Sequence, residues 1–162
     1  MTYTFIKAFE YTIAQEGGYS NNPNDKGGKT KFGISKRNHP DVDIENLTLD
    51  EAKEIYYNEY WDYGYDMIQT SLAVKIFDLG VNMGVRRAIK LMQATLNKYY
   101  NKDLKIDGLF GNKTITAIKE VNSKNLYSLY IFEVSLYYQE ISKKDNNKIF
   151  FVGWLNRLYK QI

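Results

Sequence analysis

Residues 71–83 are the segment that leaves the fewest possibilities for the fold. They read Ser-Leu-Ala-Val-Lys-Ile-Phe-Asp-Leu-Gly-Val-Asn-Met, so a helix built from them is apolar on almost every side. Such a helix lies inside a protein, covered by other elements. Asp78 and Asn82 interrupt the apolar pattern and, being four residues apart, share one face. Buried polar groups need partners, so these two residues either line the base of a cleft or hydrogen-bond to loop backbone.

Helices on both sides of this segment are predicted by apolar side chains that recur every three or four residues. The predicted helical ranges are 3–16, 48–61, 85–121 (two helices joined by a Gly-rich turn), 126–142 and a last helix from residue 150. Thr48 and Glu51 form a capping-box pattern, and Asn112 is a candidate N-cap. Residues 19–35 are rich in Gly, Asn, Asp and Pro, which favours a small β-hairpin or an irregular loop. The sequence therefore predicts a mainly α fold.

Composition restricts the chemistry. The 162 residues include no Cys and one His, which excludes a thiolate metal site, a Cys nucleophile and a cluster of His ligands. We therefore expect no metal and no cofactor, and any acid–base chemistry has to use Asp, Glu, Tyr or Lys. The net charge is +3 and the basic residues are scattered, so nucleic-acid binding is not favoured.

The same sequence gives expectations about location. No apolar run approaches the ~18 residues of a membrane-spanning helix, so no membrane insertion is expected. The N-terminus lacks the basic and apolar regions of a standard secretory signal. We therefore expect a monomer that is made in the cytoplasm and needs help to act outside it.

Glu16 is the first candidate for catalysis. It continues the spacing of Phe9 and Ile13 to the C-terminal end of the predicted helix. Burial, the negative end of the helix dipole and a nearby Asp25 would each disfavour the anion and raise the pKa of Glu16. A glutamic acid that stays protonated near neutral pH is the general acid that a glycosidase needs. The alternative is a solvated residue in the last helical turn.

The loop after Glu16 resembles the signature of glycoside hydrolase family 108. The matching residues are Glu16-Gly-Gly-Tyr19, then Asn24-Asp25-x-Gly27-Gly28-x-Thr30-x-x-Gly33-Ile34-Ser35, and later Phe77-Asp78-x-x-Val81-Asn82-x-Gly84. This family contains N-acetylmuramidases of phage endolysins and of secretion-associated bacterial systems. The resemblance implies a lysozyme-like helical fold over residues 1–84, with Glu16 as the catalytic acid.

Two further catalytic candidates follow from this resemblance. In the similar phage-type lysozymes, an Asp lies nine residues after the Glu, as Asp25 does here. A Thr from a small hairpin follows in those enzymes, and Thr30 is offset from its position by one residue. Ordinary turn chemistry would also account for Asp25. Candidate sugar contacts are Tyr19, Tyr56, Tyr60, Trp61, Asp78 and Asn82, although the aromatic members could equally belong to the core.

Residues 85–162 carry a second resemblance. The run Asp107-Gly108-x-x-Gly111-x-x-Thr114 is similar to helical peptidoglycan-binding modules, and it is equally compatible with a tight structural turn. The closing Gly153-Trp154-Leu155-Asn156-Arg157 also resembles the family's C-terminal end. No linker separates residues 1–84 from residues 85–162, so we expect two closely packed regions.

Together these features predict a peptidoglycan hydrolase. The expected reaction is cleavage of the β-1,4 bond between N-acetylmuramic acid and N-acetylglucosamine, with bacterial peptidoglycan as the partner. Two alternatives stay open: a lytic transglycosylase that uses Glu16 alone, and a non-catalytic cell-wall-binding or secretion accessory protein. The expected place of action is the periplasm or cell wall, reached through a holin or a secretion apparatus. Phage lysis and bacterial secretion are not distinguished by the sequence.

Overall fold

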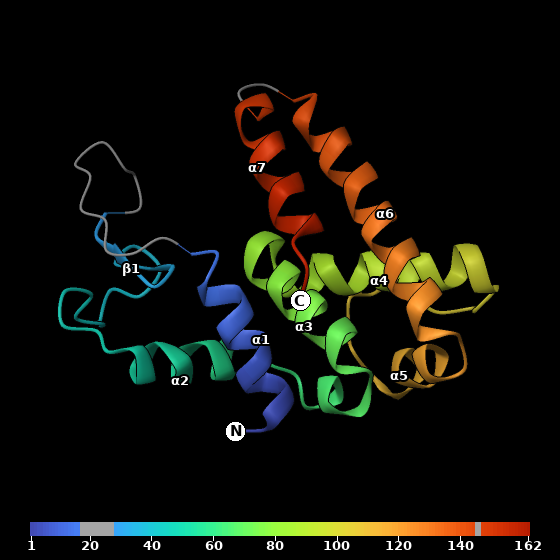
Figure 1. The fold of residues 1–162 in the computed structure, drawn as a ribbon, viewed down its shortest axis with the longest axis horizontal. Helices are drawn as coiled ribbons and strands as arrows, with labels where there is room; N and C mark the ends of the chain where they lie inside the picture. Colours follow the sequence, from blue (N-terminus) through green and yellow to red (C-terminus); the bar gives the residue numbers. More distant parts are fainter. Residues whose placement is uncertain (17–27, 145–146) are drawn as a thin grey trace.

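A computed structural model describes residues 1–16, 28–144 and 147–162 of the chain (Figure 1). In order, the elements are α1 (Tyr3–Ile13), β1 (Thr30–Lys31), β2 (Ile34–Ser35), α2 (Leu49–Tyr60), the short 3-10 helix η1 (Tyr63–Met67), α3 (Thr70–Met83), α4 (Val85–Tyr100), α5 (Asn112–Lys119), α6 (Ser123–Ser142) and α7 (Lys148–Tyr159). The predicted mainly α fold is confirmed. Within these described ranges, no helix combines the length and apolar character that crossing a membrane requires.

Helix α3 lies at the centre of the molecule. Every residue from Leu72 to Gly80 is buried, and α1 and α4 both pack against the helix. Figure 1 shows α1 and α2 on one side of α3, and α4 to α7 on the other. The helix that was predicted to lie inside the protein is therefore the one around which the others assemble.

One core runs through both predicted regions. The rings of Tyr65 and Phe110 meet edge to face, with their centroids 4.8 Å apart. The hydroxyl of Tyr130 donates to the Ala88 carbonyl at 3.0 Å. Side chains from residues 5 to 158 belong to the same buried cluster. Residues on both sides of position 84 therefore contribute to one buried cluster. The division into two regions at residue 84 stays a prediction.

Helix ends agree with the sequence in one case and differ in two. The predicted capping box is formed, because the Thr48 hydroxyl accepts from the Glu51 N–H and the Glu51 carboxylate accepts from the Thr48 N–H. Helix α1 ends at Ile13 rather than at residue 16, and Glu16 follows in a turn whose N–H reaches the Ile13 carbonyl at 3.2 Å. Asn112 is not an N-cap, because Gly111 occupies that position and Asn112 is already helical.

The predicted small hairpin is present within the described residues. Thr30 pairs with Ser35 and Lys31 pairs with Ile34, in antiparallel register. The two turn residues between the strands, Phe32 and Gly33, both have positive φ, 52° and 75°. Two positive φ values in a two-residue turn match the right-handed twist of the flanking strands. The turn therefore folds back tightly, and this geometry positions Gly33 for the site described next.

Candidate active site

Glu16 lies in the wall of a polar pocket of about 240 Å³. The pocket is built from segments that are far apart in the sequence: the end of α1, the hairpin, the segment before α2, α2 itself, α3 and α7. Its lining residues are Glu16, Gly33, Ile34, Asn38, His39, Tyr56, Tyr60, Val81, Asn82 and Arg157. The side chain of Glu16 is 21% exposed. The sequence placed Glu16 in the last turn of a helix, and the structure places it in a turn at the edge of this pocket.

Arg157 joins Glu16 to the buried Asp78. Its Nη1 donates to Glu16 Oε1 at 2.7 Å, and its Nη2 and Nε donate to Asp78 Oδ1 at 2.8 and 3.1 Å. The Asp78 side chain is fully buried. The guanidinium cation thus lies in direct contact with both carboxylates, an arrangement that the sequence analysis did not include. Arg157 is the site residue that sequence reasoning missed, although it closes the C-terminal motif that resembled the family.

The hairpin turn brings backbone directly against Glu16. A Cβ atom added to Gly33 would lie 2.5 Å from the Tyr56 hydroxyl oxygen and 3.0 Å from Glu16 Oε2. The Tyr56 hydroxyl donates to the Phe32 carbonyl at 3.0 Å, which fixes the turn on α2. Glycine at position 33 is therefore required for two reasons: its φ of 75° and the absence of space for a side chain.

We expect Gly33→Ala to lower the cell-wall hydrolysis that the sequence predicts by about 10²-fold, because the added methyl group has to displace Tyr56 or Glu16. Gly28→Ala is the matched control. Gly28 has a similar φ of 71°, but a Cβ there would meet its nearest neighbour, Lys36 Cβ, only at 4.0 Å. Both variants should lose about 1–3 kcal/mol from backbone strain. Turbidity clearing and thermal unfolding are measured for both, and equal activity of the two variants would show that contact at Gly33 is unimportant.

The aromatic candidates separate into two groups. Tyr56 and Tyr60 line the pocket, and burial, followed by the nearby Glu16 carboxylate, raises the pKa of Tyr56. Trp61 does not line the pocket: its ring packs edge to face against Phe5 and Tyr65 in the core. The structure thus leaves Tyr60 and Tyr56 as candidate sugar contacts and assigns Trp61 to packing.

Asp78 and Asn82 find partners that neither sequence alternative named. Both share a face of α3, and Asn82 also lines the pocket. Asn82 Oδ1 accepts from the Tyr138 hydroxyl of α6 at 2.6 Å, whereas Asp78 accepts from Arg157 of α7. Asp78 Oδ1 and Asn82 Oδ1 are therefore bonded by side chains of the C-terminal helices, whereas the buried Asp78 Oδ2 has no hydrogen-bond partner among the described residues.

Three candidates remain: the catalytic candidates Asp25 and Thr30 and the sugar-contact candidate Tyr19. Tyr19 and Asp25 lie outside the part of the chain that the structure describes. Thr30 lies in β1, where its hydroxyl faces the Gly28 carbonyl at 3.4 Å, and it is not among the lining residues. In the described ranges, no three Asp, Glu or His side chains gather in a way that could hold a metal ion.

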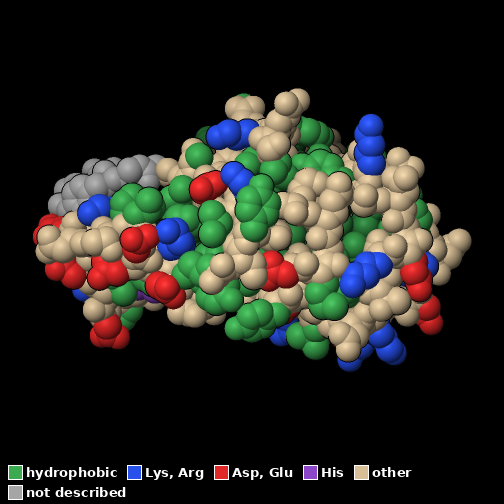
Figure 2. Space-filling model, turned by 60° about the horizontal axis from the view of Figure 1, so that its bottom comes forward, with side chains coloured by type: hydrophobic (Ala, Val, Ile, Leu, Met, Phe, Trp, Pro, Cys, Tyr) green, Lys and Arg blue, Asp and Glu red, His purple; other side chains and the backbone are tan. Residues whose placement is uncertain are grey.

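A second hollow, of about 560 Å³, lies between α2 and the segment before it. Its acidic lining residues are Asp41, Asp43, Glu51 and Glu54. Figure 2 shows acidic side chains gathered at this end of the molecule. Such a surface repels anions, including the carboxylates of peptidoglycan stem peptides. The smaller pocket at Glu16 is therefore the better candidate for an active site.

Comparison with protein families places this pocket in a known context. The model described as glycosyl hydrolase 108 matches residues 9–84, which include Glu16, the hairpin and α3. This part of the chain, residues 9–84, is thus similar to glycosyl hydrolase family 108. A second model, described as a predicted peptidoglycan domain, matches residues 87–159. The protein is thus a glycoside hydrolase that acts on peptidoglycan.

The fold of this hydrolase is also found among solved structures. It is similar to the structure of SagA from Brucella abortus, with a TM-score of 0.77 and 24% sequence identity. The match covers 96% of this chain and 89% of that one. A search of the curated proteins found no match. At this level of identity the similarity shows the fold alone.

In the peptidoglycan domain of the hydrolase, the motif from Asp107 to Thr114 forms a turn that closes on α4. The buried Gln93 holds it: its amide donates to Asp107, to the Leu109 carbonyl and to Thr114, and its oxygen accepts from the Gly108 N–H. The Leu109 N–H bond, followed by the Gln93 bond, lowers the pKa of Asp107. Gly108 has a φ of 77°, and a Cβ there would lie 2.7 Å from a backbone oxygen of α4. The structural function of this motif is therefore visible, and it depends on Gln93, to which the sequence analysis gave no role.

Proposed function

We propose that this glycoside hydrolase is an N-acetylmuramidase, with Glu16 as its general acid. It would cleave the β-1,4 bond between N-acetylmuramic acid and N-acetylglucosamine. The observation that supports the proposal is the position of Glu16: among the lining residues that the structure describes, it is the carboxylate that borders the pocket within the family 108 match. Its Oε1 is held by Arg157, while Oε2 lies against Gly33.

In the proposed reaction, Glu16 gives its proton to the glycosidic oxygen as positive charge develops on the sugar ring. Arg157 then stabilises the carboxylate that forms. Asp25, with Thr30, is proposed to position a water molecule on the opposite face of the sugar. Inversion would require the carboxyl groups of Glu16 and Asp25 to lie about 6.5–9.5 Å apart.

The proposed substrate contacts follow from the lining of the pocket. Tyr60 is half-buried beside Tyr56, with 5.5 Å between the ring centroids, so it offers an aromatic surface on which a sugar ring can pack. Asn82 offers an amide group for sugar hydroxyls. Because peptidoglycan lies outside the cytoplasmic membrane, we propose that the enzyme acts in the periplasm or cell wall and reaches it through a holin or a secretion apparatus.

Analysis of the products tests the proposal. We expect digested peptidoglycan, after borohydride reduction and mass spectrometry, to carry new reducing ends on N-acetylmuramic acid. A lytic transglycosylase would leave 1,6-anhydro ends that are lighter by one water molecule. Reducing ends on N-acetylglucosamine would indicate cleavage of the other glycosidic bond, and the absence of new ends would indicate a binding protein. Each of these three results would contradict the proposal.

A further inference from the structure

We propose that Arg157, which belongs to the peptidoglycan domain, is a positioning residue of the hydrolase active site. It would hold the Glu16 carboxylate in a fixed orientation in the pocket. Together, the positive charge of Arg157 and the negative charge of Asp78 would determine how readily Glu16 takes up and releases its proton. The inference rests on the proposed function of Glu16. If the inference holds, the C-terminal domain contributes a residue to the active site, in addition to any role in binding the cell wall.

The geometry of the ion pairs is the first argument. The Arg157 side chain is 14% exposed, and three of its N–H groups are directed to carboxylate oxygens at 2.7–3.1 Å. A planar guanidinium that binds two carboxylates at once fixes the direction of both. Glu16 lies in the turn after α1 and Asp78 lies in the middle of α3, so Arg157 orients the carboxylate of Glu16 relative to the central helix.

The balance of charge is the second argument. Burial lowers the pKa of Arg157, but Asp78 and Glu16 together raise it above its ordinary value, so the guanidinium stays charged. Alone, this cation would hold Glu16 in its ionised form, which cannot act as an acid. Asp78 neutralises the cation while Glu16 carries its proton. Once that proton is given to the substrate, Arg157 is within 2.7 Å of the new carboxylate.

Other groups face the same carboxylates from the surrounding elements. Tyr56 and Tyr60 of α2 and His39 of the preceding segment share the pocket with Glu16. Behind it, Asp78 also acts on Lys75 of α3, Tyr11 of α1, and Tyr127 and Tyr138 of α6. Apart from Arg157, Lys75 and His39, these groups are tyrosines, which are neutral near pH 7. His39 Nδ1 lies 3.4 Å from another carboxylate, that of Glu59. Arg157 is thus the cation in direct contact with Glu16.

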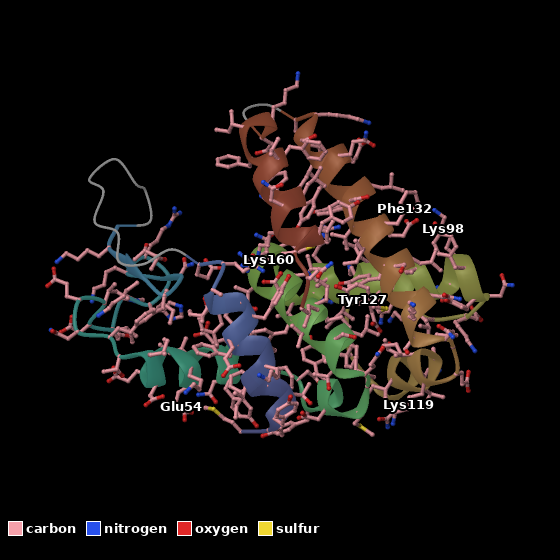
Figure 3. All side chains as sticks on the ribbon, viewed as in Figure 1. Glu54, Lys98, Lys119, Tyr127, Phe132 and Lys160 are labelled. Atoms are coloured by element: carbon pink, nitrogen blue, oxygen red, sulfur yellow. The ribbon has the colours of Figure 1, made fainter. Side chains whose placement is uncertain are left out.

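A buried lysine fixes the position of the helix that carries Arg157. Lys75 is fully buried, and its Nζ donates to the Leu158 carbonyl at 3.1 Å and to the Tyr11 hydroxyl at 2.7 Å. Figure 3 labels Lys160 near the end of α7, and its carbonyl accepts from Lys75 Nζ at 3.4 Å. The Tyr11 hydroxyl donates to the Lys160 carbonyl at 2.8 Å. The end of α7 is therefore anchored on both helices that present the carboxylates, which keeps Arg157 in register with them.

The test is the pH dependence of kcat/KM. Activity requires protonated Glu16, so it is lost on the alkaline limb, as pH rises through the pKa of Glu16. Asp78→Asn keeps an oxygen for Arg157 but removes the balancing charge. We expect its alkaline limb to move to lower pH by about 1 unit or more. Adding Arg157→Met to this variant removes the cation as well, and should move the limb back to higher pH by about 1 unit or more.

A third variant separates position from charge. Arg157→Lys keeps the positive charge but loses the planar fork, so we expect a fall in kcat of about 10²-fold with little change in KM or in the alkaline limb. Asp66→Asn is the control, because Asp66 bonds to Thr2 at the opposite end of α1 from Glu16. It should leave the pH profile unchanged. Thermal unfolding shows that each variant is folded.

The outcomes distinguish this inference from the proposed function. One outcome is that Glu16→Gln is inactive while folded Asp78→Asn keeps the alkaline limb of the unchanged chain. The proposed role of Arg157 is then wrong, and the assignment of Glu16 as general acid is retained. If Asp78→Asn does not fold, an Arg157→Lys variant with unchanged kcat overturns the inference instead. If Glu16→Gln keeps its activity, the proposed general acid fails, and the inference fails with it.

Discussion

Glu16→Gln is expected to fold normally and to lose cell-wall hydrolysis by about 10²- to 10⁴-fold, the range typical for removal of a general acid. The amide has nearly the shape of the protonated carboxyl group, and its oxygen can still accept the hydrogen bond from Arg157. Arg157 also keeps its two bonds to Asp78, so no buried cation is left without a partner. The loss should therefore be chemical rather than structural.

Glu10→Gln is the matched control for this variant. Glu10 lies in α1, the helix that precedes Glu16, and it is exposed and pairs at the surface with Lys7 at 3.3 Å. Such a pair contributes little to stability. We expect this control to clear a cell suspension at the rate of the unchanged chain. Clearing by Glu16→Gln within about tenfold of that rate, well short of a general acid's contribution, would remove Glu16 from the catalytic role.

Removal of residues 85–162 is expected to abolish cooperative folding of the rest. Helix α3 is buried on all sides, and α4 covers one of them. Truncation after Gly84 would also remove Phe110 from Tyr65 and remove Arg157 from Asp78, which leaves an uncompensated buried charge. Loss of one partner of a buried ion pair alone costs about 3–5 kcal/mol, a large part of the stability of a typical domain.

Size-exclusion chromatography and urea unfolding test this expectation, with the full chain in the same buffer as the control. The truncated chain should elute as aggregate or unfold without a cooperative transition. A sharp transition from a monomeric chain of residues 1–84 would show that the N-terminal region has a core of its own. The shared core described here would then be unnecessary for folding.

The order of the helices could be predicted from the sequence because their apolar side chains recur at helical spacing. The all-round apolar pattern of residues 71–83 was sufficient to place α3 inside, and the capping box located the start of α2. The end of α1 was less predictable. Beyond Ile13 the chain tightens into a turn, because the N–H groups of Gln15 and Glu16 bond to the carbonyls three residues back, at Thr12 and Ile13. Such bonds leave no signal in the spacing of apolar residues.

The site was only partly predictable, because half of it is made by long-range contacts. Glu16 could be found from its helical phase and its motif, and Tyr56, Tyr60 and Asn82 from their positions on the flanking helices. The contact with Arg157 could not, since 141 positions separate the two residues. Trp61 was a candidate sugar contact that the structure places against Phe5 in the core. The sequence could not show this, because an aromatic side chain has the same spacing whether it faces a sugar or the core.

The hydrogen bonds around Gln93 change what the Asp107–Thr114 motif can be taken to mean. The Gln93 amide is shared among Asp107, Leu109 and Thr114, and the Gly108 N–H is also occupied. Groups that already have hydrogen-bond partners within the turn are poor candidates for binding a glycan strand. The motif thus indicates the conformation of the backbone in this turn, and it does not by itself indicate which ligand the region binds. Affinity of this half of the molecule for the cell wall has to come from groups whose hydrogen-bonding capacity is still open to solvent.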